Sequence, residues 1–309
     1  MLTRRRAIAV KLETTYRTDS VPTSSADAIE VEDPTWAITD NRTGTRKTAG
    51  GFGGLKDVKA GELVEVTFMV PLQGSSAAGT AGDIDPLLQI AGYDAPTVVA
   101  STSVTYDTLL ESSIKSASCY FWDDGKLIKL VGCRGNISGA LTIGDAYGKL
   151  SYTLKGHLAS NPTDLAYPSS FTFDNVEPPP LKNLSGLLLG GAYVPEISSL
   201  TFELGNVLTP SDSMYEANGF GEIVITDRDI VGTFDPLDTL VATQDWFDDW
   251  KQGTSKTLTT GVIGSTAGNR YSIAFSDVYY RELSSEDRNG LTGNTIGFHS
   301  VGTMTIAYT

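Results

Sequence analysis

Short apolar runs alternate with turn residues between positions 116 and 157, a pattern typical of a β-meander. Asp124-Gly125 predicts a two-residue hairpin, because both central residues of a type I′ turn need positive φ. A second turn is expected at the glycine-containing cluster of residues 132–136. Directly opposed residues share a face, so one face is predicted to be core: Cys119, Phe121, Ile128, Leu130, Ile137, Leu141, Ile143, Leu150, Tyr152 and Leu154.

The other face of the meander is polar. It is formed by Ser138, Thr142, Ser151, Thr153, Lys155 and His157. Because successive side chains of a strand point to opposite sides, we expect this face to meet water or a hydrated channel.

The rest of the chain also indicates many short strands joined by turns, which predicts an all-β fold, a β-sandwich or barrel, with one or two short helices. Asp85 is expected to cap a helix that has Pro86 in its first turn and Gly92 at its end. A second helix is expected at residues 244–251. Further strands are expected at residues 7–13, 29–38, 61–70, 103–106, 221–226, 258–263, 270–279 and 295–308.

The chain is expected to divide into a β module at residues 1–160, a linker or crossover at 161–180 and a second β module at 181–309. Three consecutive prolines at 178–180 belong to neither a helix interior nor a central strand. Residues 221–226 echo 61–66, and a short helix is expected after each of these strands. This parallel predicts a tandem duplication.

Composition narrows the class of protein. Among 309 residues, 37 acidic and 23 basic side chains give a net charge of −14, which argues against wrapping nucleic acid through its phosphates. The two cysteines are expected to be free thiols, because Cys119 faces Leu130 rather than Cys133. An arginine-rich start precedes an apolar run too short for export, and no run is long enough for a membrane helix. We therefore expect a soluble protein made in the cytoplasm, without membrane contact.

No reactive constellation suggests an enzyme. The chain lacks a Gly-x-Ser-x-Gly elbow and a His-Glu-x-x-His motif, and His157 and His299 have no third ligand nearby in sequence. Asp245, Asp248 and Asp249 fall among aromatic residues of the second expected helix, which predicts aromatics inward and acids toward solvent. We expect no catalytic residue, metal or cofactor.

A polar, glycine-rich segment at residues 39–60 is too long for an ordinary connection and is expected to be a contact arm. It concentrates bases in an acidic chain, so we expect it to contact acids of a neighbouring copy. Its candidate contact residues are Arg42, Arg46, Lys47, Gly50, Gly51, Phe52, Gly53, Gly54 and Lys56.

The meander, the Gly132-Cys-Arg-Gly135 turn and the Asp85–Tyr93 segment ahead of it resemble the tail tube (major tail) proteins of long-tailed bacteriophages. The similarity covers residues 60–158 well and the C-terminal half loosely. It implies a β-sandwich whose copies join edge to edge into rings, which stack into a helical tube for DNA ejection. The implied location is the virion, after assembly in the bacterial cytoplasm. The implied partners are the tape measure, tail terminator and distal tail proteins, with DNA passing through the lumen without specific binding.

Two modules per chain would let three chains form a pseudo-sixfold ring, with a hexamer as the alternative. Acids facing the lumen would keep DNA from binding, and the candidates are Glu62, Glu65, Asp227 and Asp229. Alternation places Glu62 and Glu65 on opposite faces. The competing hypothesis is a carbohydrate-binding or adhesive β-sandwich that uses Trp36, Tyr93 and Trp122.

Overall fold

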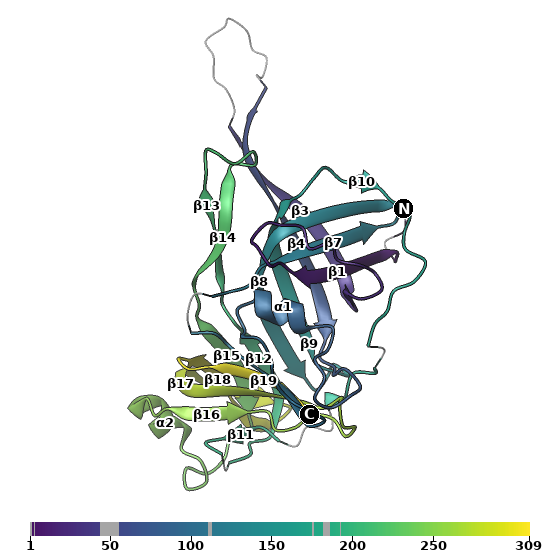
Figure 1. Ribbon diagram of the computed structural model, residues 1–309. Helices are drawn as coiled ribbons and strands as arrows, with labels where there is room; N and C mark the ends of the chain where they lie inside the picture. The colour runs from purple at the N-terminus through teal and green to yellow at the C-terminus, as the bar shows by residue number, and fades with distance from the viewer. Residues whose placement is uncertain are drawn as a thin grey trace, which may run out of the picture.

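The computed structural model describes residues 2, 4–43, 56–110, 113–174, 176–181, 186–191 and 193–309. These residues form a mostly β protein with two short helices, which confirms the predicted fold class (Figure 1). The strands pack around one apolar core that contains side chains from both halves of the chain.

Most elements of the N-terminal half surround this core. They are β1 (Arg6–Leu12), β2 (Ala28–Ile29), β3 (Glu32–Thr43), β4 (Val58–Pro71), α1 (Asp85–Ile90), β5 (Thr97–Val99), β6 (Ser103–Asp107), β7 (Ala117–Asp123), β8 (Lys126–Thr142) and β9 (Lys149–Leu158). The C-terminal half contains β10 (Thr163–Asp164), β11 (Leu188–Leu189), β12 (Ile197–Glu203), β13 (Val207–Asp212), β14 (Phe220–Asp227), β15 (Ile230–Pro236), α2 (Trp246–Gln252), β16 (Lys256–Thr259), β17 (Tyr271–Arg288), β18 (Leu291–Ser300) and β19 (Met304–Tyr308).

The β7–β8 hairpin has the predicted turn and register. Asp124 and Gly125 have φ values of +36° and +98°, and Cys119 pairs with Leu130. Cys119 and Cys133 are buried free thiols, as expected, and burial raises the pKa of Cys119 to about 12. Local turn chemistry therefore fixes this part of the sheet.

The turn expected at residues 132–136 is wrong. β8 runs unbroken through this segment, and a β-bulge shifts its pairing with β9 between Val131 and Arg134. Gly132 supplies the required positive φ of +63°. A bulge accommodates an extra residue, and regular pairing resumes at Arg134, which pairs with Lys155 of β9 and therefore shares its face of the sheet.

The segment at residues 39–60 is not simply a loop. Residues 39–43 of β3 pair with residues 58–63 of β4, so the hairpin continues beyond the body of the protein (Figure 1). Residues 41–43 and 58–60 are exposed on both faces, which explains why the sequence shows no apolar alternation there. We call residues 39–60 the arm; residues 44–55 lie outside the described part of the chain.

Both predicted helices are present, with differences in detail. Ile84, not Asp85, is the N-cap of α1, and the Asp85 carboxylate instead accepts hydrogen bonds from Gln89. In α2 only Trp246 is buried, whereas Phe247 and Trp250 are exposed, so the expected inward orientation of all three aromatic side chains is wrong. The reason is that α2 covers the end of the fold and contacts it along a narrow stripe.

One sheet connects the two halves of the chain. β8 pairs with β12 from Ser138 to Thr142, and β6 pairs with the C-terminal strand β19. β13 and β14 form a separate hairpin. The tandem duplication stays a prediction, because these pairings join the halves without relating them by a repeat.

Residues 160–174 cross back over the N-terminal half. Tyr167 and Phe171 pack on an apolar patch formed by β1, β7 and β8, where Phe171 lies 5.7 Å from the Trp122 ring. Asp174 and Asp83 each accept a hydrogen bond from the backbone N–H of the other, at 2.9 and 3.0 Å. This segment therefore covers a face of the sheet rather than hanging free.

Candidate assembly interface

A continuous polar face runs across the sheet from β3 and β4 to β17. Buried Val64, Val66 and Phe68 of β4 alternate with the half-buried Glu65 and Thr67. Thr67 pairs with Thr153 of β9, and the hydroxyl groups of Thr35 and Thr67 lie 2.7 Å apart. These two hydroxyl groups thus form a hydrogen bond across β3 and β4.

The C-terminal half continues this face without interruption. Ser151 of β9 pairs with Ser138 of β8, and Ser138 pairs with Glu203 of β12. Farther along, the Thr201 and Thr233 hydroxyls of β12 and β15 lie 2.7 Å apart. A groove of about 700 Å³ crosses this polar face, and its lining includes Met69, Lys149, Ser151, Thr201, Thr233 and Glu282.

Two of the four predicted lumen acids lie on the polar face, and both have basic neighbours. Glu65 forms an ion pair of 3.9 Å with Lys155. Asp229 lies 2.7 Å from Nε2 of His299 and 3.3 Å from Arg281. Local bases therefore offset much of the negative charge of these two carboxylates.

The other two predicted acids lie elsewhere. Glu62 is on the arm side of β4 and forms an ion pair with Lys59. Asp227 ends β14, where its carboxylate accepts the backbone N–H of Arg228 at 2.8 Å. Regular pairing from Asp40–Glu62 to Thr35–Thr67 places Glu62 and Glu65 on opposite faces of β4.

The polar-faced sheet ends in two strand edges. Among the described strand pairings, residues 37–43 of β3 pair only with β4, and residues 282–288 of β17 pair only with β18. Pro34, which has no N–H to donate, lies in β3, as is usual for an edge strand. Such edges present unpaired backbone groups to another chain.

Only part of the predicted contact arm can be placed. Arg42 is exposed and forms an ion pair with Asp40 of the same strand, and Lys56 is exposed just before β4. Ile38 and Val58 add exposed apolar side chains to the same hairpin. The remaining predicted contact residues lie outside the described residues: Arg46, Lys47, Gly50, Gly51, Phe52, Gly53 and Gly54.

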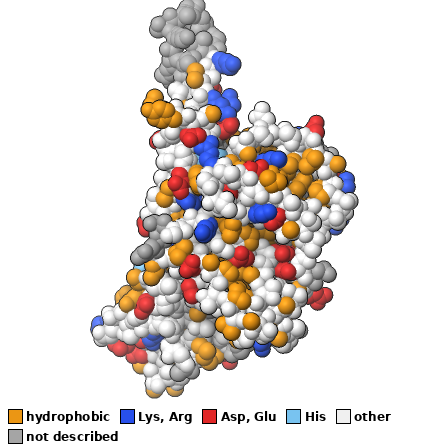
Figure 2. Space-filling model, in the orientation of Figure 1, with side chains coloured by type: hydrophobic (Ala, Val, Ile, Leu, Met, Phe, Trp, Pro, Cys, Tyr) orange, Lys and Arg blue, Asp and Glu red, His pale blue; other side chains and the backbone are white. Residues whose placement is uncertain are grey.

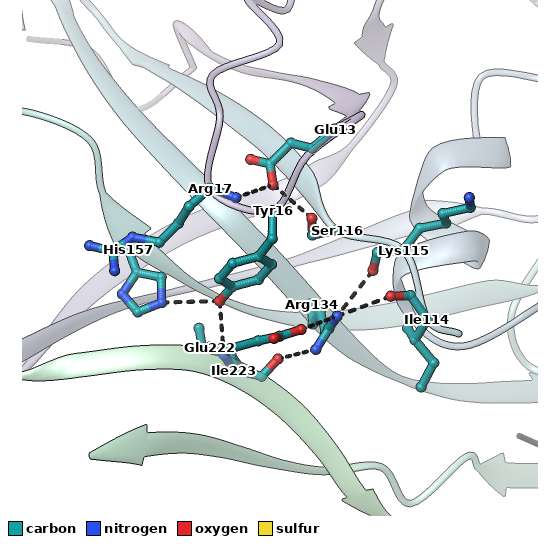
Figure 3. A network of polar contacts seen from close by, with 10 residues as sticks. All are labelled: Glu13, Tyr16, Arg17, Ile114, Lys115, Ser116, Arg134, His157, Glu222 and Ile223. Atoms are coloured by element: carbon teal, nitrogen blue, oxygen red, sulfur yellow. Dashed lines mark hydrogen bonds and ion pairs between the residues drawn. The ribbon is translucent and has the colours of Figure 1, made fainter. Parts of the chain in front are cut away.

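A polar cluster attaches the β13–β14 hairpin to the body (Figure 3). Arg134 of the β8 bulge donates hydrogen bonds to the backbone oxygens of Ile223 and of Ile114, the latter at 3.0 Å, and to Glu222 at 2.7 Å. The Tyr16 hydroxyl accepts the Ile223 N–H at 2.8 Å. We call this cluster, together with His157 and Asn218, the clamp.

Glu13 holds the turn that carries Tyr16. Its buried carboxylate accepts hydrogen bonds from the Ser116 and Ser118 hydroxyls at 2.7 and 2.9 Å, and from the Gly132 N–H at 2.8 Å. It also accepts the Arg17 N–H at 2.9 Å. Four donors therefore satisfy this buried carboxylate, and no local sequence motif marks it.

His157 is fully buried at the centre of the clamp, so its expected place on the solvated face is wrong. Its Nδ1 lies 2.6 Å from the Asn218 amide nitrogen. Its Nε2 lies 3.2 Å from the Tyr16 hydroxyl (Figure 3). Burial, with the nearby positive charge of Arg17, lowers the pKa of His157 to about 4. The ring is therefore neutral near pH 7, with Nδ1 accepting from Asn218.

Acidification should weaken the fold through His157. Its pKa is about 4 when folded and 6.5 in the unfolded reference, so the unfolded chain binds the proton first as the pH falls. Between pH 7 and 4 the wild type should lose about 2–4 kcal/mol of unfolding free energy relative to His157→Gln. Urea denaturation at several pH values measures this difference.

The comparison with His157→Gln is needed because Asp83 acts in the opposite direction. Burial and the nearby Asp174 carboxylate raise the pKa of Asp83 to about 6, so the folded state binds this proton first. Both proteins share that contribution, which cancels in the difference. Equal pH slopes for wild type and variant would contradict the assignment to His157.

Removing Arg134 should loosen the clamp. Arg134→Met leaves buried backbone oxygens without donors and should lower the unfolding free energy by about 2–4 kcal/mol. Limited proteolysis should also cut the β13–β14 hairpin faster. Arg42→Met on the exposed arm is the control and should change stability by less than about 0.5 kcal/mol. A variant at position 134 that is as stable and protease-resistant as this control would show that the clamp contributes little.

The aromatic side chains considered for a carbohydrate site are not grouped on the surface. Tyr93 and Trp122 are buried in the core, and only Trp36 is partly exposed. Sugar rings stack on exposed aromatic faces, so Tyr93 and Trp122 are not available for this contact.

Within the described residues, no group of three or more His, Cys, Asp or Glu side chains is arranged to hold a metal ion. No described helix has the length and apolar character needed to cross a bilayer. Comparison with protein-family models and with curated protein sequences finds no match. The polar face, its two strand edges and the arm are therefore the features of the molecule from which a function can be inferred.

Proposed function

We propose that this chain is a structural protein, not an enzyme, whose copies join into rings that stack into a hollow tube. The sequence resemblance to bacteriophage tail tube proteins makes this tube a conduit for DNA ejection in the virion. The implied partners are other copies of the chain and the tape measure, tail terminator and distal tail proteins.

The observation that carries this proposal is the polar-faced sheet that spans both halves and ends in two open edges. An edge strand that stays in solution invites pairing with other chains and is usually shielded. Pairing the β3 edge of one copy with the β17 edge of the next would shield both and continue the sheet. Repetition of such a heterologous contact closes into a ring when the rotation fits.

The polar face suits the lining of a channel for DNA. Two pairs of Thr hydroxyls are hydrogen-bonded across its strands, and two of its acids, Glu65 and Asp229, lie beside bases. Such a surface offers no dense basic stripe to hold phosphates, so DNA would pass without specific binding. We therefore propose a lining that is polar and balanced in charge, rather than a uniform ring of acids, although the chain as a whole is acidic.

Three chains per ring follow if each half supplies one sector of a sixfold lumen. This rests on the predicted duplication, and a six-chain ring is the alternative. The carbohydrate-binding hypothesis has less support, because two of its three aromatic side chains are buried.

Electron microscopy of the purified protein tests the proposal. We expect rings or tubes, with three chains per ring in a three-dimensional reconstruction. A monodisperse monomer at all concentrations, with a shift on a glycan array, would support the carbohydrate-binding alternative instead. Rings of six chains would contradict only the predicted stoichiometry.

Shortening the arm should separate ring formation from stacking. Deleting residues 50–54 removes glycine-rich sequence between β3 and β4 and leaves every described core residue in place. The variant should keep its thermal stability and form rings, but not tubes. Tubes of normal length from this variant would rule out the arm as the stacking contact.

A further inference from the structure

The helix α2 lies at the end of the molecule opposite the arm (Figure 1), and the segment around it carries several exposed apolar side chains. They come from one short segment, residues 238–252, which we call the α2 end. Their exposed fractions are 80% for Leu240, 68% for Val241, 71% for Phe247 and 45% for Trp250. Single exposed apolar residues are ordinary, but four of them in fifteen positions indicate a contact surface.

Two of these side chains, Phe247 and Trp250, stand on α2, whose position is fixed, and Leu240 and Val241 lie just before it. Asp245 caps α2 by accepting the Asp248 N–H at 2.9 Å, and Gly253 ends it with a φ of +59°. Trp246 is buried against Phe234 and Tyr280, with ring centroids 6.3 Å apart in each case. Trp250 Nε1 also donates to the backbone oxygen of Arg281 at 3.2 Å. A partner would therefore meet a surface that needs little reordering.

The charge of the α2 end is opposite to that of the arm. Residues 238–252 contain four acidic residues and one basic residue, whereas residues 39–60 contain five basic and two acidic residues. Figure 2 shows Asp and Glu side chains near the α2 end and Lys and Arg side chains along the arm. Asp249 is paired with Lys256, which leaves Asp238 and Asp248 as the exposed acids of this end.

We propose that the α2 end receives the arm of a second copy in the adjacent ring. This inference rests on the proposed tube function and identifies the receiving surface for ring stacking. The apolar side chains of Phe247 and Leu240 pack against exposed apolar side chains of the arm such as Val58. The carboxylates of Asp238 and Asp248 face the basic side chains of the arm. The arm and the α2 end lie at opposite ends of the molecule. The contact between them is therefore heterologous and repeats along an open stack.

Removing the apolar contact should weaken stacking without affecting the fold. Phe247→Ser and Leu240→Ser are exposed changes, and Leu165→Ser, also exposed but on the segment after β10, is the matched control. Losing one buried apolar side chain should raise the protein concentration needed for tube formation about tenfold or more. Light scattering measures that concentration, and electron microscopy counts single rings against tubes.

Crosslinking identifies the occupant directly. A photo-reactive amino acid at position 247 should link to residues 39–60 of another copy, as mass spectrometry of assembled tubes would show. Asp248→Lys should reduce stacking, and Lys56→Glu in the same chain should partly restore it.

The outcomes separate this inference from the function on which it rests. If wild-type tubes form and the position 247 crosslink falls on another segment, or Phe247→Ser behaves like Leu165→Ser, the α2 end is not the receiver. The tube function would then stand. If the wild type forms neither rings nor tubes, the proposed function fails and this inference fails with it.

Discussion

The pairing of β8 with β12 is the interaction on which the rest of the structure depends. β8 is long enough to pair with β7 near its start, with β9 along most of its length and with β12 at its end. It therefore belongs to both halves of the chain and joins their polar faces into one surface. Without this shared strand, the sheet would have two further open edges inside the molecule, and the core would divide.

The β8 bulge adds a second constraint. Gly132 breaks the regular alternation, and Arg134, which follows the bulge, donates a hydrogen bond to the β13–β14 hairpin. The polar clamp holds this hairpin mainly through hydrogen bonds, since Ile223 is its one fully buried apolar residue among those the structure describes. The hairpin is therefore attached through directional contacts, whose strength depends on neutral His157 and charged Arg134.

Sequence reasoning succeeded where local chemistry decides the structure. The Asp124-Gly125 turn, the apolar alternation of β4 and β9 and the positions of both helices follow from turn preferences and periodicity. It failed where tertiary contacts decide. The outer strand residues of the arm are exposed on both faces and show no apolar alternation. The glycine-containing cluster at Gly132 is compatible with either a turn or a bulge. Glu13, Tyr16 and Arg134 meet only through contacts distant in sequence, which no local motif records.

The central claim is that the β3 and β17 edges of neighbouring copies pair to continue the polar-faced sheet around a lumen. A cryo-EM reconstruction of the assembled protein tests it most directly. The account predicts backbone hydrogen bonds between residues 37–43 of one copy and residues 282–288 of the next, with Thr67, Thr201 and Thr233 facing the lumen. A ring in which both edges stay exposed, or in which the polar face forms the outer wall, would contradict it.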